Sequence, residues 1–354
     1  MTPRYSGKSE SVFQENYLNE KLVAGAGGSG HPLKYLWRAA MTVVIAWVRT
    51  VHDCEELVFV SDSRLSGDGR NFDACPKILS LPRSDCVIAY AGYSGHAFPM
   101  ILQLQRSIDS HEPARRGSLD IPTIRTHALK IFDRMAKLIH PSTHIYPEQD
   151  VSPEASFVFG GYSWVKKEFE LWTFTHSKST NRFEARPATW IGFSSELNRY
   201  VVLLAKFPRQ GPDQFSKIAF AGTEEQVQKA KHLLLDKLNA GKTEEKIQQG
   251  MDWQPFEVIR DMLRDPNRDE SIGGAPQIVK LYQYMHSASL AVYWPDRKGN
   301  QVYLQGRPCL GYEQVDNWIL DPDTLKSEHP LFTKDDDEYI ARLDPSSEGD
   351  ISSS

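Results

Sequence analysis

Long apolar runs are absent from this sequence. No uncharged apolar stretch approaches the roughly 18 to 20 residues that a membrane-spanning helix requires. The first forty residues also lack the apolar core of a secretory signal peptide. These absences argue against a protein with membrane-spanning helices, and we expect a soluble, cytoplasmic protein.

A strong excess of charge of either sign is also missing. The chain has 41 Lys and Arg residues against 46 Asp and Glu residues, which gives a formal net charge of −5. Nucleic acids and anionic membrane surfaces are bound by basic patches, and the composition indicates none. We therefore expect neither nucleic acid nor membrane as a partner.

The sequence has few cysteines, and their spacing matches no common framework. Cys54, Cys75, Cys86 and Cys309 form no CxxC pair and accompany no paired-histidine pattern. A zinc site and a disulfide scaffold are therefore not indicated, and reduced thiols are expected.

Blocks of strand-like and helix-like pattern are present instead. Apolar alternation predicts strands at 42–49, 56–62, 77–81, 86–91, 155–161, 169–174, 188–192, 278–284, 288–293 and 301–305. Three- and four-residue apolar spacing predicts helices at 94–109 and 121–139 and a helix pair within 223–263. Strand blocks that alternate with helix pairs predict an α+β fold, a four-layer αββα sandwich of two antiparallel sheets flanked by helices.

Three regions follow from this pattern. The polar, glycine-rich residues 1–41 are typical of a flexible leader or pro-segment that need not belong to the mature chain. Residues 42–310 carry the predicted strands and helices, and residues 311–354 are expected to form an acidic, largely extended tail.

Threonine 42 stands directly behind Met41 and at the head of an apolar strand. A threonine with a free α-amine carries a hydroxyl nucleophile and its own base. Within the intact chain the nitrogen of Thr42 is an amide, which cannot accept a proton. Downstream lie Asp62 in the segment Ser61-Asp62-Ser63-Arg64, Lys77 in Cys75-Pro76-Lys77-Ile78, and Gly92 in Ala91-Gly92-Tyr93.

In order and spacing, these motifs resemble the amino-terminal-nucleophile hydrolases, in particular proteasome β-subunits and HslV-type peptidases, over about residues 42–295. The resemblance implies that Thr42 is the nucleophile, that Lys77 lowers its pKa and that Asp62 holds Lys77. The backbone N–H of Gly92 is expected to stabilise the oxyanion. This hydrolysis requires no metal and no organic cofactor.

Two further segments match the family with departures. Arg268-Asp269-Glu270-Ser271-Ile272-Gly273-Gly274 is similar to the family's Asp-x-x-Ser-Gly-Gly segment, with Asp269 at the acidic position but isoleucine where the serine is expected. Ser271, one place earlier, is the nearest hydroxyl. In Trp190-Ile191-Gly192-Phe193-Ser194, which resembles the family's Ile-Gly-Ser-Gly turn, phenylalanine replaces the usual serine and Ser194 follows it.

The expected activity requires Thr42 to be amino-terminal, and two routes to that state are open. Self-cleavage in the family usually has glycine before the threonine, whereas Met41 stands there in this chain. The other route is translation from Met41 followed by removal of that methionine, as in the Met-Thr start of HslV-type peptidases.

The function expected from the resemblance is a proteasome-like threonine peptidase acting on peptide or protein substrates. Homo-oligomer rings and an ATP-dependent unfoldase partner are also implied by the family. Two alternatives stay open, because fold does not fix function. One is a non-catalytic scaffold or interaction protein, and the other is an amidohydrolase that acts on a small amide.

Overall fold

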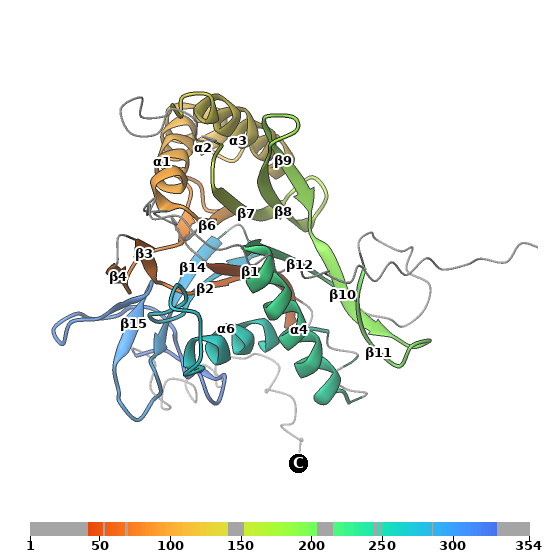
Figure 1. Ribbon diagram of the computed structural model, residues 1–354, viewed down its shortest axis with the longest axis vertical. Helices are drawn as coiled ribbons and strands as arrows, with labels where there is room; N and C mark the ends of the chain where they lie inside the picture. The colour runs from red at the N-terminus through yellow and green to blue at the C-terminus, as the bar shows by residue number, and fades with distance from the viewer. Residues whose placement is uncertain are drawn as a thin grey trace, which may run out of the picture. The chain divides into compact units, whose positions relative to one another are not determined.

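The computed structural model describes residues 42–51, 54–67, 70–140, 152–203, 215–243, 247, 250–284 and 286–330 (Figure 1). All of them belong to one compact unit. The expected leader, residues 1–41, lies outside the described residues.

The larger sheet has β1 near its centre. Its strand order is β11-β10-β12-β1-β2-β13-β14-β15-β16, and β17 and β18 join through β14. The neighbours pair antiparallel except β14 and β17, which are parallel. The strands are β1 (Val43–Val51), β2 (Cys54–Ser61), β10 (Thr189–Ser194), β11 (Arg199–Leu203), β12 (Phe215–Gly222), β13 (Gln277–Tyr282), β14 (His286–Tyr293), β15 (Val302–Leu304), β16 (Arg307–Pro308), β17 (Ile319–Leu320) and β18 (Ser327–Glu328).

A second, five-stranded antiparallel sheet has the order β5-β6-β7-β8-β9. Its strands are β5 (Ile78–Ser80), β6 (Cys86–Gly92), β7 (Ala155–Ser163), β8 (Glu168–Ser177) and β9 (Arg182–Pro187). A short hairpin, β3 (Leu65–Gly67) with β4 (Arg70–Phe72), follows β2. Val44 and Phe59 of the larger sheet share one buried cluster with Val87 and Val158 of the smaller sheet. The two sheets therefore pack face to face on apolar side chains.

The described helices pack on the sheets through their apolar faces. They are α1 (Ser94–Ser110), α2 (Glu112–Arg115), α3 (Ile121–Ala136), α4 (Glu224–Ala240) and α6 (Gln254–Arg264). Residues of α1 and α3 share a core with β6 and β7, and residues of α4 and α6 share another with β1 and β12. The Thr223 side chain accepts a hydrogen bond from the Gln226 N–H and caps α4. None of the described helices is long and apolar enough to cross a membrane.

The αββα class expected from the sequence is wrong for this chain. Strands account for 39% of the described residues and helices for 26%, so the molecule is mainly β, with large antiparallel sheets, rather than a helix-flanked sandwich. Around β14, β15 and β17 an apolar cluster built on Ala291, Tyr293 and Ile319 contains no helical residue. The strand content was underestimated because β9, β11 and β12 were not expected, and because strands of two or three residues such as β3, β4 and β16–β18 are too short for an alternation to be recognised.

The expected tail also needs correction at its start. Ile319 and Leu320 are buried, and β17 pairs with β14 in the register Ala291↔Ile319. An apolar pair inside a polar segment is enough to add this strand to the sheet. The sheet thus continues past residue 310, and residues 331–354 of the expected tail lie outside the described residues.

Candidate active site around Thr42

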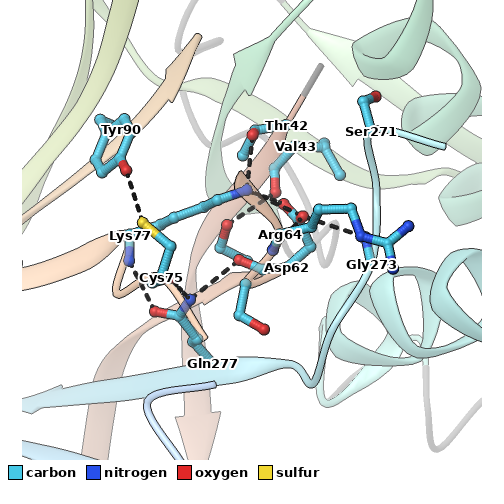
Figure 2. Close-up of polar contacts among 12 residues, drawn as sticks. Thr42, Val43, Asp62, Arg64, Cys75, Lys77, Tyr90, Ser271, Gly273 and Gln277 are labelled. Carbon is cyan, nitrogen blue, oxygen red and sulfur yellow. Dashed lines mark hydrogen bonds and ion pairs between the residues drawn. The ribbon is translucent and has the colours of Figure 1, made fainter. Parts of the chain in front are cut away.

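Three side chains predicted from the sequence meet at one buried point (Figure 2). Lys77 Nζ donates to Thr42 Oγ1 at 2.7 Å. The same nitrogen lies 2.9 Å from Asp62 Oδ1 and 3.0 Å from Asp62 Oδ2. A single ammonium group therefore bridges the threonine hydroxyl and the carboxylate.

The three side chains in this contact are almost completely buried. The exposed fractions are 2% for Thr42, 0% for Asp62 and 1% for Lys77. Burial raises the pKa of Asp62 and lowers the pKa of Lys77, because desolvation penalises each charged form more than their mutual attraction favours it. Two backbone N–H groups, from Arg64 at 3.1 Å and Gly273 at 3.4 Å, also donate to the Asp62 carboxylate. A buried ion pair of this kind is costly to place in a core and marks a candidate functional site.

The ends of strands bring the three residues together. Thr42 immediately precedes β1, Asp62 immediately follows β2, and β1 and β2 pair antiparallel, so these two ends meet. Lys77 immediately precedes β5. Gly222 lies against the Thr42 backbone with φ +151°, and a Cβ there would lie 2.4 Å from the Thr42 carbonyl oxygen. Only glycine allows this close approach at the head of β1.

Gln277, a functional candidate missed from the sequence, ties the site together. Its side chain is fully buried and accepts a hydrogen bond from the Lys77 N–H at 2.9 Å. Its amide group donates to the Asp62 carbonyl at 3.1 Å and to the Cys75 carbonyl at 2.7 Å. The strand that it heads also contains Lys280, so the sequence pattern gave no signal for these contacts. Gln277 fixes the backbone of the two segments that carry Lys77 and Asp62.

Replacing Gln277 by methionine should lower the free energy of unfolding by about 3 kcal/mol, because it leaves one N–H and two carbonyl groups buried without partners. Chemical denaturation measures this loss. The same change at Gln103, exposed on α1, is the matched control and should cost less than about 0.5 kcal/mol. Equal effects at the two positions would contradict the positioning role of Gln277.

The segment 269–274 is joined to the site through its backbone. Ser271 donates from its hydroxyl to Asp269 Oδ1 at 2.5 Å and from its N–H to the same oxygen at 2.8 Å. Gly273 N–H contacts the Asp62 carboxylate, as described above. The structure thus places Asp269 and Ser271 together on a segment whose backbone contacts Asp62. Ile272, where the family has serine, is 2% exposed and packs in the core beside α6.

A second ion pair, between Arg64 and Asp73, is more exposed and lies in the segment that follows Asp62. Arg64 binds Asp73 through two parallel contacts of 2.6 and 2.8 Å, and its third nitrogen donates to the Glu270 carbonyl at 2.9 Å. The Arg64 guanidinium holds the pKa of Asp73 below its ordinary value. Arg64 therefore links the segment after Asp62 to the segment before Gly273.

Gly92 lies at the end of β6, just before α1, with φ +102°. A Cβ there would lie 2.3 Å from the Glu154 carbonyl oxygen, so glycine is required. Strand β6 contacts β1 across the two sheets. The expected oxyanion role of its N–H remains a prediction.

Ser194 is not brought to this site. Thr189 of β10 lies opposite Ile218 of β12, and Ile218 lies opposite Trp47 of β1. Strands β10 and β1 therefore run in the same direction, with Thr189 level with Trp47. Thr42 lies five residues before Trp47, whereas Ser194 lies five residues after Thr189. The separation is about ten residues, or roughly 30 Å at about 3.3 Å per residue. Phenylalanine at 193 packs instead in the core, so similarity to the family's turn was misleading.

Cys75 lies two residues before Lys77, and its Sγ is 3.2 Å from the Tyr90 hydroxyl. Burial raises the pKa of both groups, which keeps them neutral at physiological pH. Within the described ranges, no three His, Cys, Asp or Glu side chains are grouped as a metal site would need.

The chain was compared with known proteins. No protein-family model matches it, and the comparison with curated proteins also found no match.

Proposed function

We propose that this chain is a threonine-type amino-terminal-nucleophile hydrolase that cleaves peptide amide bonds, akin to proteasome β-subunits and HslV-type peptidases. One observation carries the proposal: the buried Lys77 ammonium group that contacts both Thr42 Oγ1 and Asp62. A threonine that served only as a strand residue would not need a buried ion pair against its hydroxyl, since burying the pair costs several kcal/mol per ion.

Each group has a role in the proposed reaction. The free α-amine of Thr42 takes the proton from Oγ1, and Oγ1 attacks the carbonyl carbon of the substrate. Lys77 stays protonated and stabilises the charge developing on Oγ1, while the Gly92 N–H stabilises the oxyanion. The protonated α-amine then gives its proton to the leaving amine, and an acyl ester of Thr42 remains. Water, activated by the same α-amine, hydrolyses this ester and restores the hydroxyl.

The state of the bond between Met41 and Thr42 decides whether this reaction is possible. While the bond is intact, Thr42 carries an amide nitrogen and has no base of its own. The proposal therefore requires a mature chain that begins at Thr42, most simply through translation from Met41 and loss of that methionine. A cytoplasmic location, a homo-oligomeric ring and an ATP-dependent unfoldase partner belong to the same proposal.

A non-catalytic scaffold is the second candidate. It is favoured by the near-complete burial of Thr42, which is 2% exposed, because a substrate carbonyl must reach Oγ1. A small amide would reach the hydroxyl more easily than a protein, so a broad panel of substrates is needed.

The test is the intact mass of the protein isolated from its native host, combined with turnover of fluorogenic peptides and small acyl amides. A mature chain that begins at Thr42 and turns over one of these substrates supports the hydrolase. A sole product that retains residues 1–41, or an inert chain that begins at Thr42, would support the scaffold instead.

Activity should decline on the alkaline side at a pH below that of an ordinary lysine, whose pKa is about 10.4. Burial lowers the pKa of Lys77, so its ammonium group loses the proton, and the charge beside Oγ1, at a lower pH than a free lysine. The measurement is kcat/KM as a function of pH. Lys77→Arg, which stays protonated, should remove the alkaline limb; a limb that persists in this variant belongs to another group.

A further inference from the structure

A cavity of about 600 Å³ lies beside the segment that follows Asp62. Three arginines border it: Arg64, Arg264 and Arg268. Its apolar wall is lined by Leu263, Trp294, Pro295 and Tyr303. The volume lies within the range of small-molecule sites, and the lining combines apolar side chains with charged groups.

The three guanidinium groups differ in how their charge is balanced. Arg64 is paired with Asp73, and Arg264 is paired with Asp323 at 2.6 Å. Arg268 makes no ion pair with a described residue. The one hydrogen bond of its guanidinium group to a described residue is a long contact of 3.4 Å to the Asp265 carbonyl, and its Nε is buried without a partner.

Among the described residues, Arg268 therefore has no carboxylate within ion-pair distance, although together with Arg64 it helps to lower the pKa of Asp73. The planar guanidinium fork suits a carboxylate, which it can bind through two parallel hydrogen bonds. Asp73 also lines the cavity; the three arginines against Asp73 and Asp323 leave one net positive charge, which suits a ligand with one negative charge. The Arg264 guanidinium lies 5.4 Å from the centre of the Trp294 ring, so an aromatic surface borders the charged end of the cavity.

We propose that this cavity binds a small organic molecule with one carboxylate and a flat apolar body, with the carboxylate on Arg268 and the body against the wall that contains Trp294. The proposal stands on the cavity and its charges and does not depend on the hydrolase function. It concerns a site lined by none of Thr42, Asp62 or Lys77.

Calorimetric titration of the full chain with phenylacetate tests the site. We expect saturable binding of one molecule per chain with a Kd of about 1 mM or tighter, the range that a fragment of this size reaches. The neutral analogue phenylacetamide and the dianion phenyl phosphate should bind at least about tenfold more weakly. These two comparisons use the unaltered protein, so they do not depend on the folding of any variant.

Arg268→Gln should weaken phenylacetate binding roughly tenfold to a hundredfold, because a hydrogen-bonded charge is lost. Arg268→Lys, which keeps the charge but loses the fork, should fall between this variant and the wild type. Arg182→Gln, at an exposed position in β9, is the control and should bind as the wild type does. The proposal is overturned by an absence of saturable phenylacetate binding, by phenylacetamide or phenyl phosphate binding as tightly, or by unchanged affinity in a folded Arg268→Gln variant.

Discussion

Replacing Lys77 by methionine should lower kcat/KM of the mature chain by about 10²- to 10³-fold and the free energy of unfolding by about 3–5 kcal/mol. The loss of activity follows from removing the ammonium group that lies 2.7 Å from Thr42 Oγ1. The loss of stability has a separate origin, because Asp62 would remain fully buried without its only described ion-pair partner. Peptide turnover and chemical denaturation measure the two effects.

A double variant separates these effects. Asp62→Leu combined with Lys77→Met replaces the buried pair by apolar side chains, an exchange that is often neutral or stabilising. We expect the double variant to recover most of the stability lost in Lys77→Met and none of the activity. Wild-type stability in Lys77→Met would show that the pair is not formed in the folded protein. Full turnover in a folded Lys77→Met variant would remove Lys77 from the mechanism.

The central part of the site could be predicted because its residues lie at the ends of recognisable strands. Thr42, Asp62 and Lys77 each adjoin a strand with a clear apolar pattern, and their order along the chain matched that of a known class of hydrolases. Antiparallel pairing of β1 with β2 then placed two of the three side chains together. Local pattern and a motif were sufficient here because the neighbouring strands are consecutive in the sequence.

Other parts depend on contacts that have no local signal. The Gln277 side chain binds the backbone of Lys77, a partner 200 positions away, and nothing in the pattern of β13 indicates that contact. Ser194 shows the opposite failure, in which a short sequence similarity suggested a site that the strand register places roughly 30 Å away. The helix-flanked class failed for a third reason, since the two-residue strands β16–β18 gain their stability from pairing with neighbours rather than from their own sequence.

Replacing Thr42 by alanine should reduce turnover by at least about 10⁴-fold in a chain that begins at Met41 and loses that methionine. Alanine keeps the α-amine but removes the hydroxyl that attacks the substrate. The effect on stability should be much smaller, about 1 kcal/mol, because the change removes one hydrogen bond to Lys77. Thr42→Ser is the matched control, since it keeps the hydroxyl and should retain measurable turnover with an acyl ester intermediate detectable by mass spectrometry.

The amine and the hydroxyl can be tested independently, because each can be removed while the other is kept. The chain that retains residues 1–41 has the Thr42 hydroxyl but an amide nitrogen, so we expect no turnover from it. The Thr42→Ala chain that begins at position 42 has the amine but no hydroxyl, and it should be inactive for the opposite reason. Turnover by the Thr42→Ala chain would mean that another group performs the attack. Turnover by the chain that retains residues 1–41 would mean that a group other than the Thr42 amine serves as the base.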